Sequence, residues 1–244
     1  MIDDFWEFTV KITWINMARI ARIVVAHYPH HITQRGNRRQ DTFFCADDYR
    51  YYKKLMAEWC RKFGVEIWAY CLMPNHVHLI AVPESEDGLR KAIGEAHRRY
   101  TCQINFREQW KGHLWQGRFT SFLMDEKYLL AAARYVELNP VKAGLVEKPE
   151  KYLWSSANAH MKGQDDELVV VKKLLVMVDG WHKFLSISSA EEDDVLIRRH
   201  EQTGRPLGSD TFVRVLEKKL SRILIPSKGG RPKKQSIITS KVSP

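Results

Sequence analysis

Residues 65–83 read VEIWAYCLMPNHVHLIAVP, two apolar runs separated by a proline and an asparagine. These are typical turn residues, so the pattern predicts two strands joined by a bend. Side chains two apart on a strand share a face, so His76 and His78 should project together, with Val77 opposite. Two such imidazoles can serve a metal, a phosphate or a reacting base, but they are equally consistent with two satisfied polar residues at a strand end.

The segments before and after this hairpin predict the helices and strands that would form a complete domain with it. Apolar residues recur at helical spacing after Asp47, and Gly64 ends that helix. The expected elements are strand 22–35, helix 47–63, strands 65–75 and 76–83, helix 87–108, strand 113–124 and helix 126–138. This β-α-β-β-α-β order predicts an α+β, ferredoxin-like fold: an antiparallel sheet with helices on one face, an added helix, and a helical C-terminal extension.

The composition indicates a basic protein with a packed core. The chain has 244 residues, of which 44% are hydrophobic and 28% charged, and its formal net charge is +10 with a pI of about 9.4. That hydrophobic content argues against wholesale disorder. The positive charge favours a polyanionic partner, with nucleic acid as the first candidate.

Cysteine usage and hydropathy predict a cytoplasmic protein with no membrane partner. The four cysteines form no CxxC pair, which indicates free thiols in a reducing compartment and no structural zinc site. The longest apolar run, 168–178, is short and is broken by Lys172 and Lys173. The first residues lack the basic-then-apolar order of a signal peptide.

Changes in composition divide the chain into four parts. Residues 1–16 are expected to be an extension, because Met17 begins a basic lead into the first strand. The main domain should cover 17–160, and 161–225 a helical extension. Two helices joined by TGRPLGS make that extension a candidate DNA-binding module. The tail 226–244 is basic and rich in Gly, Pro and Ser, so no packed structure is expected there.

A metal site needs a third group beside the two histidines, and the helix 126–138 suggests one. Tyr135 and Asn139 stand four residues apart, so they should share a helix face. The carbonyl oxygen of Asn139 suits Mg²⁺ or Mn²⁺, and the phenol of Tyr135 can act as a nucleophile. Tyr135 could instead be a core tyrosine, and Tyr128 lies on nearly the same face. The adjacent His30 and His31 face opposite ways, so at most one can join the site, and a structural or DNA-contacting role is favoured for them.

Three motifs in order resemble those of a known family. The segments NHVHL at 75–79, WQGRF at 115–119 and YVELNPVKAG at 135–144 are similar to the REP-associated tyrosine transposases. These belong to the HUH (His-hydrophobic-His) single-strand transposases that use one tyrosine. The similarity runs from about residue 17 to 160, and TGRPLGSDTFV resembles a C-terminal extension of some members.

The resemblance implies roles for particular residues. It assigns His76 and His78 as metal ligands and Tyr135 as the nucleophile that forms a 5′-phosphotyrosine on single-stranded DNA. Asn139 becomes the third ligand, although some relatives have Gln at this position. The implied cofactor is Mg²⁺ or Mn²⁺, and the implied substrate is a DNA hairpin with a short flanking single strand.

Several further residues are candidates for DNA contact. An aromatic ring and two polar side chains in the WQGRF motif could stack on bases and hold phosphate. A cluster of arginines follows the first strand, and one more lies between the two C-terminal helices. The alternative is a packed Trp with solvated charges. The candidates are Arg35, Arg38, Arg39, Trp115, Gln116, Arg118 and Arg205.

The sequence thus predicts a metal-dependent DNA strand transferase acting near hairpins. One alternative is a hairpin-binding regulator that has lost its chemistry. Another is a metal-dependent hydrolase that uses water, for which the sequence offers no obvious base. Whether the chain works as a monomer or a homodimer is left open.

Overall fold

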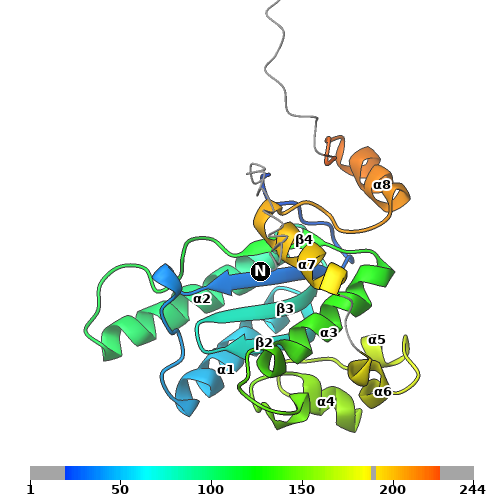
Figure 1. Ribbon diagram of the computed structural model, residues 1–244. Coiled ribbons are helices and arrows are strands. Elements are labelled where there is room, and N and C mark those ends of the chain that lie inside the picture. Colours follow the sequence, from blue (N-terminus) through cyan, green and yellow to red (C-terminus); the bar gives the residue numbers. More distant parts are fainter. Residues whose placement is uncertain (1–19, 188–190, 226–244) are drawn as a thin grey trace, which may run out of the picture.

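The computed structural model describes residues 20–187 and 191–225, and Figure 1 shows how its elements are arranged. The predicted N-terminal extension 1–16 and basic tail 226–244 lie outside these residues. The strands are β1 His30–Arg35, β2 Val65–Met73, β3 His76–Pro83 and β4 Thr120–Leu123. The helices are α1 Ala46–Lys62, α2 Gly88–Arg107, α3 Glu126–Lys142, α4 Ala157–Lys162, α5 Lys172–Leu175, α6 Trp181–Ser186, α7 Glu191–Thr203 and α8 Asp210–Leu220, with short 3₁₀ turns at Asn37–Arg39 and Pro149–Lys151.

The four strands form one antiparallel sheet in the order β2-β3-β1-β4. The elements β1, α1, β2, β3, α2 and β4 follow one another as predicted, which confirms the ferredoxin-like reading. The register places Thr33 of β1 opposite His78 of β3, and Arg35 opposite His76. Both histidines therefore lie beside polar residues of the neighbouring strand.

Alternation along the strands separates two layers of core. Ile32, Val77 and Leu79 pack with α1 and α2 on one face. Ile80 and Phe122 pack with α3 on the other face. The prediction of helices on one face holds for α1 and α2, and the added helix α3 covers the opposite face (Figure 1). The predicted histidines belong to this second face.

Two predicted strands are shorter than expected. β1 starts only at His30, because His27 has a positive φ of 66° and Tyr28 N donates to Val25 O, which turns the chain. β4 starts only at Thr120, because Gly117 has a φ of 122° that a strand cannot accommodate. The segments before both strands are loops, and the one before β4 supplies part of the candidate site.

The C-terminal extension forms the two helices that the sequence predicts. α7 lies over β1, β4 and α3, with Ile197 fully buried. α8 begins at the N-cap Ser209, whose side chain accepts from Phe212 N, and its Leu216 packs with Ile23 and Val25. Among residues 20–187 and 191–225, no helix is both long and apolar enough to cross a bilayer.

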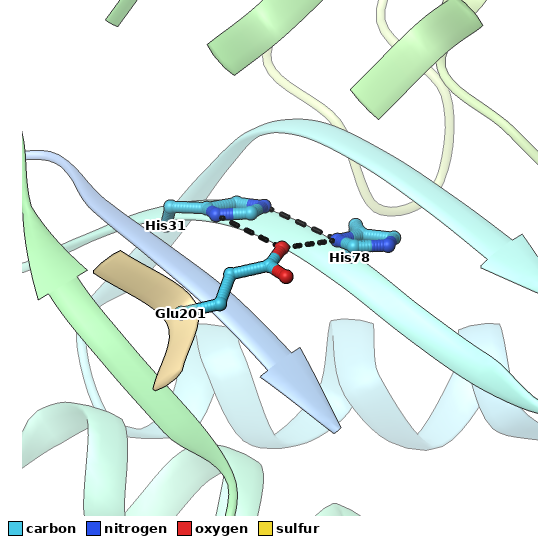
Figure 2. Close-up of side chains that lie close together, drawn as sticks. All are labelled: His31, His78 and Glu201. Atoms are coloured by element: carbon cyan, nitrogen blue, oxygen red, sulfur yellow. Dashed lines mark hydrogen bonds and ion pairs between the residues drawn. The ribbon is translucent and has the colours of Figure 1, made fainter. Parts of the chain in front are cut away.

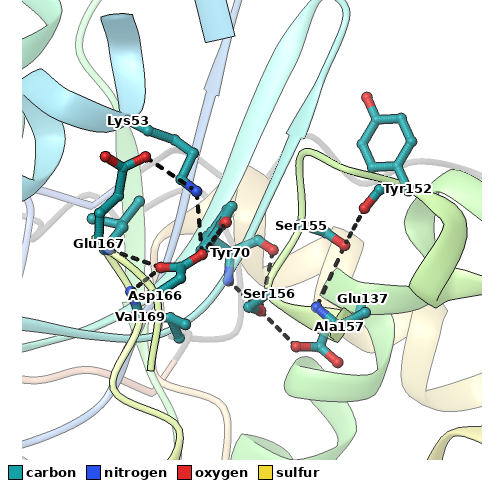
Figure 3. Close-up of polar contacts among 11 residues, drawn as sticks. Lys53, Tyr70, Glu137, Tyr152, Ser155, Ser156, Ala157, Asp166, Glu167 and Val169 are labelled. Atoms are coloured by element: carbon teal, nitrogen blue, oxygen red, sulfur yellow. Dashed lines mark hydrogen bonds and ion pairs between the residues drawn. The ribbon is translucent and has the colours of Figure 1, made fainter. Parts of the chain in front are cut away.

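A buried polar network fixes α3 against β2 and the segment that follows it. The Glu137 carboxylate accepts from Ser156 Oγ at 2.5 Å, and Figure 3 shows this contact beside Tyr70 of β2. It also accepts from His160 Nδ1 at 2.6 Å and from Trp181 Nε1 at 2.7 Å. Because buried carboxylates are costly unless hydrogen-bonded, these three donors hold the helix in one rotational setting.

Candidate active site

The two histidines of β3 share one face, as the strand period requires. Their ring centroids are 4.9 Å apart and the rings are nearly perpendicular. His76 Nδ1 lies 2.6 Å from Asn75 Oδ1, so this nitrogen carries the proton and Nε2 is left with a free lone pair. His78 is fully buried and directs its two nitrogens to different neighbours.

Helix α3 brings Tyr135 and Asn139 to the same place. Its N-terminus is capped by Asp125, whose carboxylate accepts from Tyr128 N at 3.1 Å. Asn139 Nδ2 lies 3.4 Å from His78 Nε2, and the Tyr135 ring centroid lies 5.5 Å from that of His78. The four-residue spacing therefore puts a phenol and an amide against one imidazole.

Burial keeps the site histidines neutral. It lowers the pKa of His76 to about 3, with a further contribution from the Arg35 guanidinium. Burial also lowers the pKa of His78 well below its usual range, and that of His31 to about 3. Neutral imidazole is the form that binds a metal, so these rings need no deprotonation near pH 7.

The environment of Tyr135 acts on its pKa in both directions. The residue is 5% exposed, and burial raises its pKa to about 12, helped by the Glu201 carboxylate. The Arg198 guanidinium donates a hydrogen bond to the phenol oxygen and lowers the pKa. Arg198 thus stabilises the phenolate form that a nucleophile requires.

Helix α7 supplies Glu201, which the sequence reasoning missed. Figure 2 shows it beside His31 and His78, with Oε1 3.4 Å from His78 Nδ1 and 3.7 Å from His31 Nδ1. Each of these three residues offers one ligand atom within 4.8 Å of the others, so the cluster could hold a metal ion. Burial raises the pKa of Glu201 to about 7, against the hydrogen bond that it accepts from Thr33 Oγ1 at 3.1 Å. No local spacing links α7 to the histidines, so no sequence pattern pointed to Glu201 or Arg198.

Alternation along β1 settles which of the two adjacent histidines faces the site. His31 joins the cluster, with Nε2 3.2 Å from His78 Nδ1. His30 faces away, where Nδ1 donates to Tyr28 O at 2.7 Å and Nε2 accepts from Val25 N at 3.3 Å. A structural role fits His30, whereas His31 belongs to the site.

A basic pocket of about 510 Å³ opens beside Tyr135 and brings several predicted DNA-contacting residues together. Its lining includes Arg35, Arg39, Gln116, Arg118, Arg198 and Glu201. A second pocket of about 270 Å³ is lined by His76, Tyr135, Asn139 and Lys142. Tyr135 borders both pockets, whereas Tyr128 borders neither.

Trp115 corrects the expectation of a base-stacking ring. It is 6% exposed and packs in the α1 and α2 layer, with its ring centroid 4.7 Å from that of His97. The cause is a β-bridge between Gly36 and Trp115, which turns this ring inward while Gln116 and Arg118 reach the pocket. Trp115 therefore supports the loop and offers no free face to a base.

The two other predicted contacts lie outside the basic pocket. Arg38 is exposed on the 3₁₀ turn after β1 and does not line the pocket. Arg205 donates to Leu224 O, and it thereby ties the linker before α8 to the segment after it. Among the predicted DNA-contacting residues, only Arg35, Arg39, Gln116 and Arg118 line the basic pocket beside Tyr135.

Residues 24–139, which include His76, His78, Tyr135 and Asn139, match the family described as "Transposase IS200 like". More particularly, the predicted similarity to REP-associated tyrosine transposases is confirmed. Over 132 residues, the chain is 26% identical to a Haemophilus influenzae protein named "Putative REP-associated tyrosine transposase", covering 50% of this chain and 75% of that protein. The fold also matches a solved REP-associated tyrosine transposase bound to a REP hairpin, with a TM-score of 0.53 and 22% identity over 63% of this chain and 92% of the other.

Proposed function

We propose that this chain cleaves and rejoins single-stranded DNA beside a hairpin, with Tyr135 as the nucleophile. The observation that carries the proposal is the convergence on His78: Asn139 Nδ2 lies 3.4 Å from its Nε2, and the Tyr135 ring lies 5.5 Å from its ring. Tyr135 also borders the pocket of about 270 Å³ that two of these ligands, His76 and Asn139, line. The relatives named above support the same reaction class.

The donor set of His76, His78 and Asn139 fits a divalent cation. The Nδ1 atoms of both histidines face hydrogen-bond partners, so each Nε2 carries a lone pair; that of His78 faces Asn139 Nδ2, a contact that an ion would replace. The amide of Asn139 offers a carbonyl oxygen, and mixed nitrogen and oxygen ligation suits Mg²⁺ or Mn²⁺. When bound, the ion would polarise the phosphate under attack and neutralise its developing charge.

The protein's own residues carry the covalent step. Tyr135 Oη attacks the phosphorus atom, the bond from phosphorus to the 3′ oxygen breaks, and a 5′-phosphotyrosine forms. The phenol proton is lost to solvent as Arg198 stabilises the phenolate, and the leaving 3′ oxygen takes up a proton to become a hydroxyl. Reversing these bonds with another 3′ hydroxyl rejoins a strand without ATP.

The basic pocket would guide the DNA strand to Tyr135. Arg35, Arg39 and Arg118 are placed to contact phosphates, which position a strand without reading its sequence. We assign the reaction to a domain spanning 17–160 and a stem-gripping role to the extension 161–225. Action as a monomer and action as a homodimer are both compatible with this proposal.

The decisive test is a denaturing gel of labelled hairpins with single-stranded flanks, incubated with the protein and Mn²⁺. We expect a slow band that resists SDS, needs the metal and is lost in Tyr135→Phe. Tyr128→Phe is the matched control on the same helix and should form the adduct normally. An adduct that survives in Tyr135→Phe would contradict the assignment.

Two other outcomes would replace the proposal. Cleavage without an adduct would indicate a hydrolase that uses water. Tight hairpin binding with no cleavage, by protein that binds Mn²⁺ or by protein that does not, would indicate a catalytically silent regulator. The denaturing gel separates adduct, free product and uncut strand, and a native gel of the same mixture reports hairpin binding.

A further inference from the structure

The two ring nitrogens of His78 have different neighbours, and this determines which nitrogen carries the proton. Nε2 faces the amide nitrogen Nδ2 of Asn139 at 3.4 Å. An amide nitrogen only donates, so Nε2 must hold the lone pair and Nδ1 the hydrogen. The Nε2 lone pair is thereby directed toward the side of the ring where Asn139 lies.

The Nδ1 hydrogen has two acceptors, and both lead to Glu201. Glu201 Oε1 lies 3.4 Å from His78 Nδ1, a direct route. His31 Nε2 lies 3.2 Å from the same atom, and if it accepts, His31 Nδ1 carries a proton that faces Glu201 Oε1 at 3.7 Å. In either arrangement the carboxylate of α7 ends the chain of contacts (Figure 2).

Glu201 is itself held in place from two sides. Thr33 Oγ1 of β1 donates to its Oε1 at 3.1 Å. Helix α7 is anchored to α3 by an ion pair of 2.5 Å between Asp194 and Lys142, and to the core by the fully buried Ile197. A carboxylate fixed in this way can fix the imidazole beside it.

We infer that Glu201 is a positioning residue, supplied by the C-terminal extension, that holds His78 through Nδ1 and aims Nε2 into the metal site. The inference rests on the proposed function, since it concerns the ligand set of that reaction. Metal-binding histidines commonly donate their second N–H to a carboxylate, which fixes the ring orientation and raises ligand basicity. Here that partner would come from outside the family-matched residues 24–139.

The geometry favours this role over direct ligation by Glu201. An ion held by His31, His78 and Glu201 would have to replace the hydrogen on His78 Nδ1. The contact of Asn139 Nδ2 with His78 Nε2 favours the tautomer that keeps this hydrogen. Neither His31 nor His78 lines the two pockets beside Tyr135, whereas His76 and Asn139 line the smaller one. Glu201, on the Nδ1 side, lines the larger pocket, so Tyr135 is reached from both sides of His78, but only the pocket on the Nε2 side is also lined by the second predicted histidine ligand, His76.

The test measures Mn²⁺ binding to the full chain without DNA. The EPR signal of free Mn²⁺ reports how much of the ion remains unbound. Glu201→Ala should raise the Kd for Mn²⁺ about 10- to 100-fold. Glu201→Gln keeps an oxygen acceptor and the packing volume, so its loss should be smaller, and it carries the test if the alanine variant fails to fold. Glu192→Ala, an exposed glutamate of the same helix, should leave the Kd unchanged.

His76→Ala separates positioning from direct ligation. If His76 is a ligand and Glu201 only positions His78, His76→Ala should weaken Mn²⁺ binding at least as much as Glu201→Ala does. Unchanged binding in His76→Ala would place the ion on the Glu201 side and overturn the inference.

The remaining outcomes separate this inference from the proposed function. Wild-type affinity in both Glu201 variants would overturn the positioning role but leave the proposed function standing, provided that the wild type binds Mn²⁺ and forms the adduct. A wild type that binds no Mn²⁺ would overturn both.

Discussion

His30 and His31 are neighbours on one strand, and both are fully buried, yet they belong to different parts of the molecule. The ring nitrogens of His30 are satisfied by the backbone of the turn at Val25–Tyr28, so this residue closes a loop. The ring of His31 stacks on His78 with centroids 5.3 Å apart and meets Tyr135 edge-on at 6.1 Å. Burial alone therefore does not distinguish a functional histidine; the neighbours of its ring nitrogens do.

The same division runs through the whole sheet. On the face covered by α1 and α2, strand residues pack into an apolar and aromatic core. On the face covered by α3 and α7, the ends of β1 and β3 carry histidines, threonine and arginine around a pocket. Alternate residues of the same strands thus contribute to the stability of the core and to the candidate site. Substitutions at neighbouring positions should therefore affect either stability or metal binding.

The largest expected effect is that of His78→Ala. Loss of a central ligand should remove the bound ion, which contributes several kcal/mol to such a reaction, so adduct formation should fall by about a thousandfold or more. The measurement is the initial rate of adduct formation with saturating hairpin and Mn²⁺. A rate within tenfold of wild type would show that His78 is not a ligand.

Leu79 follows His78 on β3 and lies on the opposite face of the sheet. Leu79→Ala should therefore lower the stability of the fold and leave metal binding unchanged. Leu79 is fully buried against α1 and α2, so its truncation should lower the free energy of unfolding by about 2–5 kcal/mol. Urea titration measures this change. The folded fraction should still bind Mn²⁺ with wild-type Kd, and a large loss of metal affinity would show that the two faces are not independent.

His30→Ala tests the different roles of the two adjacent histidines of β1. It leaves a buried backbone N–H at Val25 without its acceptor, so the free energy of unfolding should fall by about 1–3 kcal/mol. Binding of Mn²⁺ should not change, whereas His31→Ala should weaken it. Equal effects of the two variants on the Kd would contradict the division of roles.

The pH dependence of the stability of Asp48→Asn tests the face of the sheet that α1 and α2 cover. Burial raises the pKa of Asp48, but hydrogen bonds from Arg107 and from the Phe44 and Cys45 amides outweigh burial and lower it overall. A lowered pKa stabilises the fold above the unfolded value of about 4, and that stabilisation is lost as the pH falls through the folded value. Asp48→Asn should therefore cost about 1–2 kcal/mol at pH 7 and progressively less below pH ~4, as urea titrations at each pH would show. A cost that does not change with pH would exclude the ionised carboxylate as its source.

The smallest expected effect is that of Arg198→Ala. Arg198 lowers the pKa of Tyr135, so its removal should leave less phenolate and slow adduct formation about tenfold. Arg199→Ala, its exposed neighbour, is the control. A similar loss in both variants would indicate general attraction of DNA to a basic helix.

Local periodicity predicted the parts of the site that lie within single elements. The strand period placed His76 and His78 on one face, and the helix period placed Tyr135 and Asn139 together. It could not orient Trp115, because a bridge to Gly36 determines which way that ring turns. Glu201 and Arg198 were missed because α7 reaches the site through packing on β1, β4 and α3, a contact that no sequence spacing encodes.

The network around Glu137 has a mechanical consequence. Glu137 lies between Tyr135 and Asn139 on α3, and its carboxylate is tied to Ser156, His160 and Trp181. Turning α3 about its axis would break three buried hydrogen bonds at once, so the tyrosine can move only together with the segment that carries those donors. In the proposed reaction, Tyr135 thus keeps its position, and the DNA strand ends must move relative to it between cleavage and rejoining.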